Sequence, residues 1–464
     1  MQLSFFRISL LLFSIEASKL FLGCTPVHEI EDQTFIIEIE FSLNTELLKA
    51  WYPVSIDSSY GGFLSDFTYD WKPDGPQHKM LVTQARQVWT ASNAAMFYKD
   101  ERYHVIAEHG FRFLKDRMWD SRHGGFYMLR DREGNAIPNP QGDIKSAYGN
   151  AFAIYALAAY YTMSGDDAAL NLAQETFSWL DTHGHDPVYK GYFDALTQDG
   201  SWLYLSDPIK RRGYLGWAGW KDQNSSIHLL EAFTELYRVW PDSVLRERLL
   251  EMLILIRDTM VTDVGYLTLF FERDWTPVSF RDSSDAIREA NTPYDHISFG
   301  HDVETAYLML EASHVIGIQS DTKTLTVAKR MVDHALAKGW DDENGGFYDS
   351  GYYFDDSLSI INDAKIWWVQ AEGLNALLLM SGLFPEEKKY DEAFKKQWGY
   401  IKKYLIDHDY GGWYSEGLDL SPEQRKAPKA SVWKVNYHNM RALMNCIQML
   451  NSEHELLKSE FDKQ

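Results

Sequence analysis

The pattern of apolar and polar positions is helical along almost the whole chain. Residues 147–161 form a nearly unbroken run of Ala, Tyr, Phe and Leu, which predicts a helix buried on every side. Between 227 and 240 the apolar residues recur every three or four positions, the spacing of an amphipathic helix. The stretches 303–316, 371–380 and 440–450 resemble the first kind. Because strand-like alternation is scarce, the pattern predicts an all-α protein.

Short turns that begin with glycine and continue with aromatic or apolar residues recur six times. Their first glycines lie 63 to 80 residues apart, and each interval has room for two ordinary helices and their loops. Repetition at a regular spacing indicates a fold built from repeated structural units. Six units of two helices each predict about twelve helices, with a short hairpin in each turn. The turns are Gly61-Gly62-Phe63, Gly124-Gly125-Phe126-Tyr127, Gly191-Tyr192-Phe193, Gly265-Tyr266-Leu267, Gly345-Gly346-Phe347-Tyr348 and Gly411-Gly412-Trp413-Tyr414.

Alternate predicted helices begin with polar or aromatic residues and continue with apolar ones. In a closed ring the inner helices are buried along their length, where unpaired polar groups are costly. Polar groups at one end of the inner helices therefore predict a cleft at one mouth of a barrel, although helix capping accounts for some of them. The helix starts are Gln84-Ala85-Arg86-Gln87, Asp222-Gln223-Asn224 with His228, His301-Asp302-Val303-Glu304, Lys365 with Trp367, Trp368, Gln370 and Glu372, and Trp433 with Tyr437 and His438.

Composition and charge narrow the class of function. The 464 residues are 45% hydrophobic, which supports a large core and argues against disorder. Aromatic residues make up 15%, and flat rings can stack on sugars as well as pack in a core. The net charge of −22 repels phosphate backbones and anionic membranes, so nucleic acid is not an expected partner.

The N-terminal segment resembles a bacterial export signal that ends in a lipoprotein box. Arg7 precedes an apolar run from Ile8 to Ile15, which is too short to span a bilayer as a helix. The sequence Leu20-Phe21-Leu22-Gly23-Cys24 marks Cys24 as a possible site of lipidation. We expect an extracytoplasmic protein, periplasmic or anchored through Cys24, and a cytoplasmic location stays open. The predicted divisions are a leader at 1–24, a tether at 25–44 and a single barrel domain at 45–464.

Several pairs of candidate residues share a helix face. His301 and Glu304 are three residues apart, and a carboxylate beside an imidazole orients the ring and raises its basicity. The alternative is a helix start whose acidic residues are favoured by the helix dipole. Asn224 and His228 are four apart. Trp368 and Glu372 repeat that spacing. His438 lies among aromatic and amide residues, and Arg86 at the cleft needs an anionic partner or a developing anion.

The sequence lacks the signatures of common cofactors. The histidines show no chelating spacing on one helix, and the two cysteines, Cys24 and Cys446, are too far apart in sequence to form a Cys-rich zinc motif. Glycine-rich dinucleotide and phosphate loops are missing, as is the Gly-x-Ser-x-Gly elbow. We expect neither a metal nor an organic cofactor.

Five motifs, in this order, resemble the N-acylglucosamine 2-epimerase superfamily, and within it the cellobiose 2-epimerases, which include mannobiose 2-epimerases. They are Gln84-Ala85-Arg86-Gln87-Val88-Trp89-Thr90, Asp222-Gln223-Asn224-Ser225-Ser226-Ile227-His228, Gly300-His301-Asp302-Val303-Glu304, Lys365-Ile366-Trp367-Trp368-Val369-Gln370-Ala371-Glu372 and Trp433-Lys434-Val435-Asn436-Tyr437-His438-Asn439. The resemblance covers the chain after about residue 45 and implies an (α/α)6 barrel.

The resemblance also implies roles for single residues. It makes His301 and His438 the acid/base pair, and adds His228, Arg86 and Glu304 to the catalytic group. It implies that Asn224, Trp368, Glu372 and Trp433 bind the sugar, and we expect Tyr148 to bind it as well. The implied reaction inverts C2 of the reducing-end sugar of a disaccharide through a cis-enediolate, without a cofactor, in a protein that we expect to be monomeric.

Other readings stay open. Within the superfamily the substrate could be a monosaccharide or an N-acylglucosamine, or the reaction could be aldose–ketose isomerisation, because the enediolate can be protonated at C1. An (α/α)6 barrel can also be a glycoside hydrolase, for which Asp222, Asp302, Glu304 and Glu372 offer carboxylates. A non-catalytic glycan-binding lipoprotein would leave the histidines at the helix starts unexplained.

Overall fold

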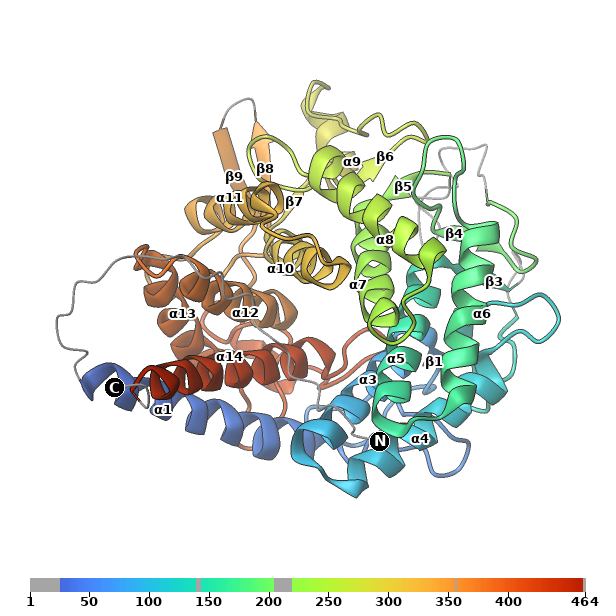
Figure 1. Ribbon diagram of the computed structural model, residues 1–464, viewed down its shortest axis with the longest axis horizontal. Helices are drawn as coiled ribbons and strands as arrows, with labels where there is room; N and C mark the ends of the chain where they lie inside the picture. Colours follow the sequence, from blue (N-terminus) through green and yellow to red (C-terminus); the bar gives the residue numbers. More distant parts are fainter. Residues whose placement is uncertain (1–25, 139–142, 204–218, 355–356, 462–464) are drawn as a thin grey trace.

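The computed structural model describes residues 26–138, 143–203, 219–354 and 357–461. The predicted leader and the lipidation site at Cys24 lie outside these residues. Within them, helices alternate between an inner and an outer layer around one axis (Figure 1). The inner helices are α3 (Leu81–Tyr98), α5 (Ala147–Ser164), α7 (Gln223–Val239), α10 (Phe299–Ile316), α12 (Trp367–Leu383) and α14 (Tyr437–Phe461). The outer helices are α1 (Pro26–Phe41), α4 (Glu101–Phe113), α6 (Asp167–His183), α8 (Ser243–Leu255), α11 (Thr322–Lys338) and α13 (Lys389–Tyr400).

The inner helices form a closed ring. Each packs on the next in chain order, and α14 returns to pack on α3. Each outer helix packs on an inner one, with α1 on α14. The expected (α/α)6 barrel of about twelve helices is confirmed. Four outer helices end in a π-helical turn: η1 (Ser42–Leu48) after α1, which leads into α2 (Lys49–Trp51), η2 (Leu114–Met118), η4 (Ile256–Met260) and η5 (Ile401–Leu405).

The predicted tether at 25–44 is corrected by the structure. Most of it forms α1, which lies beside α14 in Figure 1. Ile36, Ile39 and Leu43 are buried, because they face the barrel. The barrel therefore begins about twenty residues before the expected boundary, and the boundary at 45 falls inside η1.

The six glycine turns are each closed by a single antiparallel bridge rather than by a longer hairpin. The bridges are Ile56↔Phe63, Trp119↔Phe126, His185↔Tyr192, Val261↔Leu267, Trp340↔Phe347 and Ile406↔Trp413. Positive φ angles recur at the turn glycines, for example at Gly124 and Gly125, where an added Cβ would also collide with the Trp179 ring. The predicted sixfold repeat is confirmed.

Short antiparallel strands connect neighbouring units. A strand before an inner helix pairs with one after the following glycine turn, with registers such as Lys79↔Arg130, Ile144↔Thr197 and Ile297↔Gly351. The strands are β1 (Lys79–Met80), β2 (Leu129–Arg130), β3 (Ile144–Ser146), β4 (Ala195–Thr197), β5 (Lys221–Asp222), β6 (Phe270–Phe271), β7 (Ile297–Ser298), β8 (Ser350–Phe354) and β9 (Ser357–Asn362). Helix α9 (Asp285–Asp295) is inserted before β7, and η6 (Pro422–Lys426) before α14.

A lysine–aspartate pair whose lysine is buried repeats in five of the six units. The aspartate follows the first bridge residue of the turn, and its carboxylate is held within 3.2 Å of a lysine Nζ. The pairs are Lys79–Asp57, Lys145–Asp120, Lys221–Asp186, Lys365–Asp341 and Lys429–Asp407. In the fourth unit, Thr262 takes the place of the aspartate, and Ile297, two residues before α10, takes that of the lysine. The two charges are therefore absent together.

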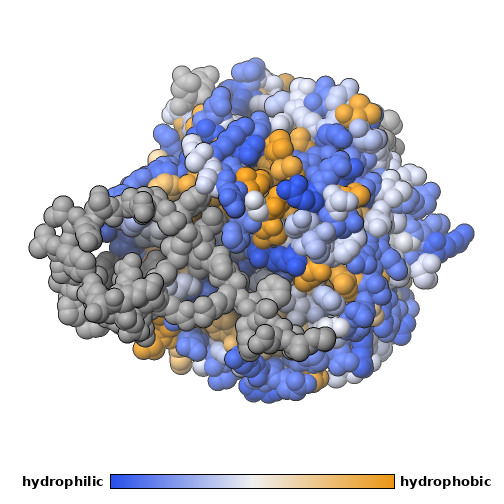
Figure 2. Space-filling view, viewed as in Figure 1, coloured by the Kyte–Doolittle hydropathy of each residue, from blue (hydrophilic) through white to orange (hydrophobic). Residues whose placement is uncertain are grey.

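The core fills the space between the layers and continues along the inner helices. Figure 2 shows one face of the ring, where hydrophobic side chains gather near the centre among hydrophilic ones. This face is filled by side chains and is not an open pore. Within the described ranges, no helix combines the length and the apolar character needed to cross a bilayer.

Candidate active site

Three histidines from different inner helices meet around aromatic rings. His228 lies on α7, His301 on α10 and His438 on α14. The Trp368 ring, on α12, lies 4.8 Å from the His301 ring and 5.7 Å from the His438 ring, measured between centroids. The two imidazoles can be no further apart than these distances combined. A single sugar ring is therefore within reach of both.

A carboxylate orients His438. Its Nδ1 lies 2.7 Å from Oε1 of Glu372, and Glu304 is 3.9 Å from the same nitrogen. The Nδ1–H therefore points at Glu372, which leaves Nε2 as the basic nitrogen. Burial lowers the pKa of His438 well below its ordinary value, and Arg86 adds to this effect. The resting imidazole is thus neutral and able to accept a proton.

The partner of His301 differs from the expected one. Its Nδ1 lies 2.8 Å from the Ser298 hydroxyl. Glu304, which shares its helix face, instead pairs with Arg441 across the barrel. The predicted orientation of His301 by Glu304 is wrong, because a fully buried guanidinium competes for the carboxylate. Burial and then His228 lower the pKa of His301 to about 3, so this imidazole is neutral as well.

Arg441 is the hub of a buried ionic network that sequence reasoning missed. Its guanidinium pairs with three carboxylates, those of Glu231, Glu304 and Glu372. Burial alone would raise the pKa of Glu231, but Arg441 and His228 hold it at about 2. The pKa of Glu372 is raised by its burial, against the opposing effect of Arg441.

The network extends to the third histidine. Glu231 accepts from His228 Nδ1 at 2.8 Å and also binds the Tyr437 hydroxyl. Helical spacing could have revealed these residues, because Glu231 follows His228 by three positions and Arg441 follows His438 by three. What the spacing could not reveal is which carboxylate on one helix serves a histidine on another.

Arg86 is held by aromatic rings. Its guanidinium lies 4.3 Å from the centroid of Phe152 and 5.0 Å from that of Tyr437, and Nη2 donates to the Tyr148 hydroxyl at 3.2 Å. Its buried Nε finds no partner among the described residues. A cation held by rings rather than by carboxylates keeps its charge for a developing anion.

Part of the proposed sugar site lines one cavity. A cavity of about 130 Å³ brings together Tyr148, Asn224 and Trp433. Asn224 Oδ1 is buried without a hydrogen-bond partner among the described residues. Trp433 is 45% exposed and so offers a ring face at the cavity. Asp194 and Asp222 share this lining, and burial followed by the charge of Asp194 raises the pKa of Asp222 to about 7.

Other polar residues at the helix starts hold the glycine turns and the helix ends. Gln84, Asp302 and Gln370 accept the backbone N–H of Phe63, Leu267 and Phe347, each within 2.9 Å. Asp222 caps α7 through Ser225. The side chains of these residues therefore stabilise the backbone of the glycine turns and the helix ends.

One group of donor atoms has the composition of a cation site. Glu304, Glu372 and His438 each place a ligand atom within 4.8 Å of the others. Arg441 contacts both carboxylates, with 2.6 Å to Glu372. The guanidinium thus supplies at these carboxylates the positive charge that a metal ion would bring.

Comparison with known proteins gives matches over nearly the whole chain. Residues 61–442 match the N-acylglucosamine 2-epimerase (GlcNAc 2-epimerase) family. The chain is 30% identical to cellobiose 2-epimerase of Ruminococcus albus, covering 89% of this chain and 98% of that protein. It is 28% identical to cellobiose 2-epimerase of Bacteroides fragilis, covering 90% and 99%.

Solved structures give the same picture. Cellobiose 2-epimerase from Spirochaeta thermophila superposes with a TM-score of 0.77 at 29% identity, covering 93% of this chain and 99% of the other. A family 76 α-mannanase from Bacteroides thetaiotaomicron shares the fold alone, with a TM-score of 0.55 at 13% identity over 93% of this chain and 99% of the other. The matches show a carbohydrate epimerase, and the chain belongs to the N-acylglucosamine 2-epimerase family.

Proposed function

We propose that the protein epimerises C2 of the reducing-end sugar of a β-1,4-linked disaccharide, converting cellobiose to glucosyl-mannose or mannobiose to mannosyl-glucose. The observation that carries this proposal is the pair of neutral imidazoles, the half-buried His301 and the buried His438, that contact one indole from different helices. Relatives named cellobiose 2-epimerase support the substrate class.

The proposed reaction begins with the open-chain aldehyde. One imidazole takes the proton from C2, which the carbonyl acidifies, and the C2–H electron pair moves into a cis-enediolate. We assign to Arg86 the preorganised donor that stabilises the charge on O1 and O2, whereas the Nδ1–H of His228 is already held by Glu231. After rotation about C2–C3, the second imidazole, once it has taken up a proton from solvent, delivers that proton to the opposite face of C2. The first imidazole returns its proton to solvent, and the ring closes.

The carboxylates support this chemistry without taking the proton. Glu372 accepts from His438, so it stabilises the imidazolium that forms when Nε2 takes up a proton. Arg441 in turn fixes Glu372 and Glu304. A glycoside hydrolase needs two carboxylates at the glycosidic bond. Here Asp302 and Asp222 hold backbone groups and the two glutamates hold Arg441, so the arrangement favours epimerisation.

Isomerisation of a monosaccharide is the second candidate. It uses the same enediolate with protonation at C1, and a D-mannose isomerase of Marinomonas mediterranea is 24% identical over 86% of the chain. Incubation with cellobiose, mannobiose, mannose and N-acetylglucosamine, without metal or nucleotide, distinguishes these cases by the anomeric proton signals. We expect a new disaccharide of unchanged mass. Conversion of mannose alone, or release of monosaccharides from the disaccharides, would contradict the proposal.

We also propose that the enzyme acts outside the cytoplasm, on the basis of the leader-like segment that ends at Cys24. Fractionation of cells that produce the full chain and a Cys24→Ala variant tests this. Membrane association that depends on Cys24 would support a lipid anchor. Recovery of both forms in the cytoplasm, with the first residues retained, would refute export.

A further inference from the structure

A groove on the outer wall of the barrel lies far from the histidines in the fold. It runs along α6, between the glycine turn that contains Gly124 and the end of α7, and encloses about 580 Å³. Asn171, Gln174, Glu175 and Ser178 line it from one face of α6. Trp119 and Trp240 contribute half-exposed indoles.

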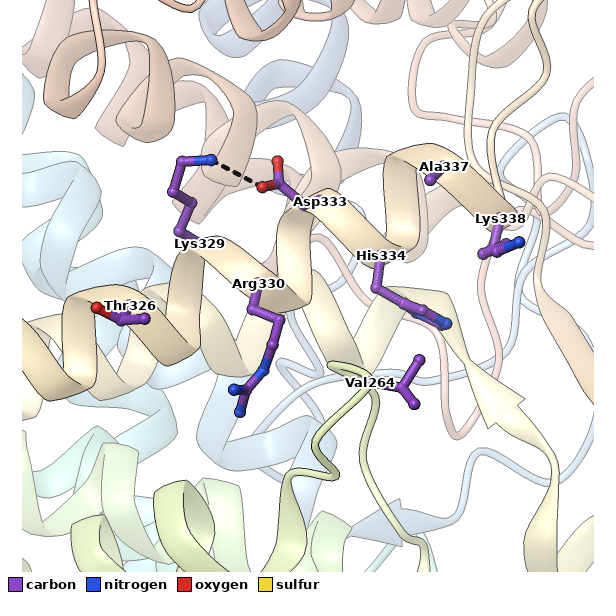
Figure 3. Close-up of a pocket in the computed structure, with 8 residues that line it drawn as sticks. All are labelled: Val264, Thr326, Lys329, Arg330, Asp333, His334, Ala337 and Lys338. Atoms are coloured by element: carbon purple, nitrogen blue, oxygen red, sulfur yellow. Dashed lines mark hydrogen bonds and ion pairs between the residues drawn. The ribbon is translucent and has the colours of Figure 1, made fainter. Parts of the chain in front are cut away.

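The sixfold repeat supplies a second groove of the same construction, two units further on. There α11 replaces α6, and the glycine turn at Val264 replaces the one at Gly124 (Figure 3). Each lining position on the helix is shifted by 155 residues, so Thr326 and Arg330 correspond to Asn171 and Glu175. The barrel geometry therefore produces both hollows, and only their side chains can distinguish them.

Two polar side chains of the α11 groove, Lys329 and Asp333, bind each other. Lys329 pairs with Asp333 at 2.8 Å, as Figure 3 shows, and with Glu387 at 3.1 Å. The α6 groove lacks such pairs: Asn171, Gln174 and Glu175 make no side-chain hydrogen bond or ion pair with any described residue. A row of unused amide and carboxylate groups on the α6 surface is therefore a property of this unit and not of the repeat.

The indoles of Trp119 and Trp240 indicate which class of ligand the α6 groove can bind. Trp119 packs edge-on against Phe126 at 5.1 Å and Trp240 against Phe177 at 5.9 Å, so each ring is anchored on one side and partly open on the other. Indoles pack on the apolar faces of pyranose rings, while amides and carboxylates bind their hydroxyls. The described residues that line the groove include no lysine or arginine, which disfavours an anionic ligand. Its volume lies within the range of about 300–1,000 Å³ typical of ligand sites.

We propose that the α6 groove is a second carbohydrate site, which binds an internal segment of a neutral hexose polymer. Such a site would hold the enzyme near polysaccharide while the barrel mouth acts on chain ends or released disaccharides. This inference does not depend on the reaction proposed above, because the groove and the histidines have no residue in common.

Affinity electrophoresis of the full-length protein through gels that contain hydroxyethylcellulose or galactomannan tests the proposal. Long polymers present few reducing ends, so retardation reports binding to internal segments. We expect retardation of the wild type by at least one polymer, and the polymer that acts distinguishes glucan from mannan. An Asn171→Ala/Glu175→Ala variant should bind at least tenfold more weakly and keep its activity on disaccharide, because both residues are exposed and unpaired.

The matched control is Thr326→Ala/Arg330→Ala in the α11 groove, which should be retarded like the wild type. Trp433→Ala, at the barrel mouth, should also be retarded normally. Three results would overturn the proposal: no retardation of the wild type by either polymer, unchanged retardation of Asn171→Ala/Glu175→Ala, or loss of retardation in Trp433→Ala.

Discussion

Replacing Lys145 by Ile tests the repeated lysine–aspartate pair as the device that fastens each glycine turn to its barrel. Nζ of Lys145 lies 2.9 Å from Asp120, and the lysine side chain is fully buried. It also donates to the carbonyl of Gly124 in the turn. Removing the lysine leaves a buried carboxylate without its ion-pair partner, which lowers the free energy of unfolding by about 3–5 kcal/mol. Asp120 retains the backbone N–H groups of Arg122 and His123 as donors, which places the expected loss near 3 kcal/mol.

The fourth unit offers the compensating change. It has Thr262 and Ile297 where the second unit has Asp120 and Lys145. The double variant Lys145→Ile/Asp120→Thr should therefore recover most of the loss, to within about 1 kcal/mol of the wild type, since it leaves no buried charge unpaired. Urea unfolding followed by circular dichroism measures all three proteins. Additive losses in the double variant would refute the reasoning.

The pH dependence provides an internal check. Lys145 and the backbone N–H groups hold the pKa of Asp120 well below its ordinary value, despite burial. A depressed carboxylate contributes stability above its unfolded pKa, and this contribution is lost as the pH falls. The gap between the wild type and Lys145→Ile should therefore be fully present at pH 7 and narrow as the pH falls below the unfolded pKa value of 3.8. A gap that does not narrow below this pH would show that the loss is not electrostatic.

Three further predictions concern the site. The pKa of His301 is lowered to about 3, so the unfolded chain binds a proton below pH 6.5 that the folded protein does not. Stability should fall on acidification through this range, and His301→Asn should flatten the slope by up to about 1.4 kcal/mol per pH unit, whereas parallel curves would contradict the shift. Arg86→Met should lower kcat by about 10²- to 10³-fold with the helical content unchanged, because it removes a preorganised donor; an unchanged kcat would exclude that role. Trp433→Ala should raise KM for the disaccharide and leave kcat within about twofold, and a selective loss of kcat would refute a role in binding alone.

The ring of helices was accessible from the sequence because its signals are local and repeated. The apolar run at 147–161 is inner helix α5, and the six glycine turns mark six units. The segment 25–44 was wrongly predicted as a tether because no glycine turn precedes it to mark a repeat unit. Its helix α1 packs on α14, from the opposite end of the chain. Such closure depends on distant packing rather than on local pattern.

The candidate site was predictable as a set of residues but not as a set of contacts. His228, His301 and His438 were found from their positions at helix starts. Arg441 was not predicted as a site residue because it lies one helical turn past His438, in an apolar stretch. Its contacts with glutamates on three other helices decide which histidine receives a carboxylate, and no spacing within one helix contains that information.

The decisive measurement is hydrogen exchange at C2 in deuterated water, with His301→Ala and His438→Ala compared on both epimers of the disaccharide. If the two imidazoles serve opposite faces of one carbon, neither variant interconverts the epimers. Each should retain exchange on one epimer at most, and that epimer should differ between the two variants. Epimerisation at the wild-type rate by either variant, with its fold intact, would contradict the assignment.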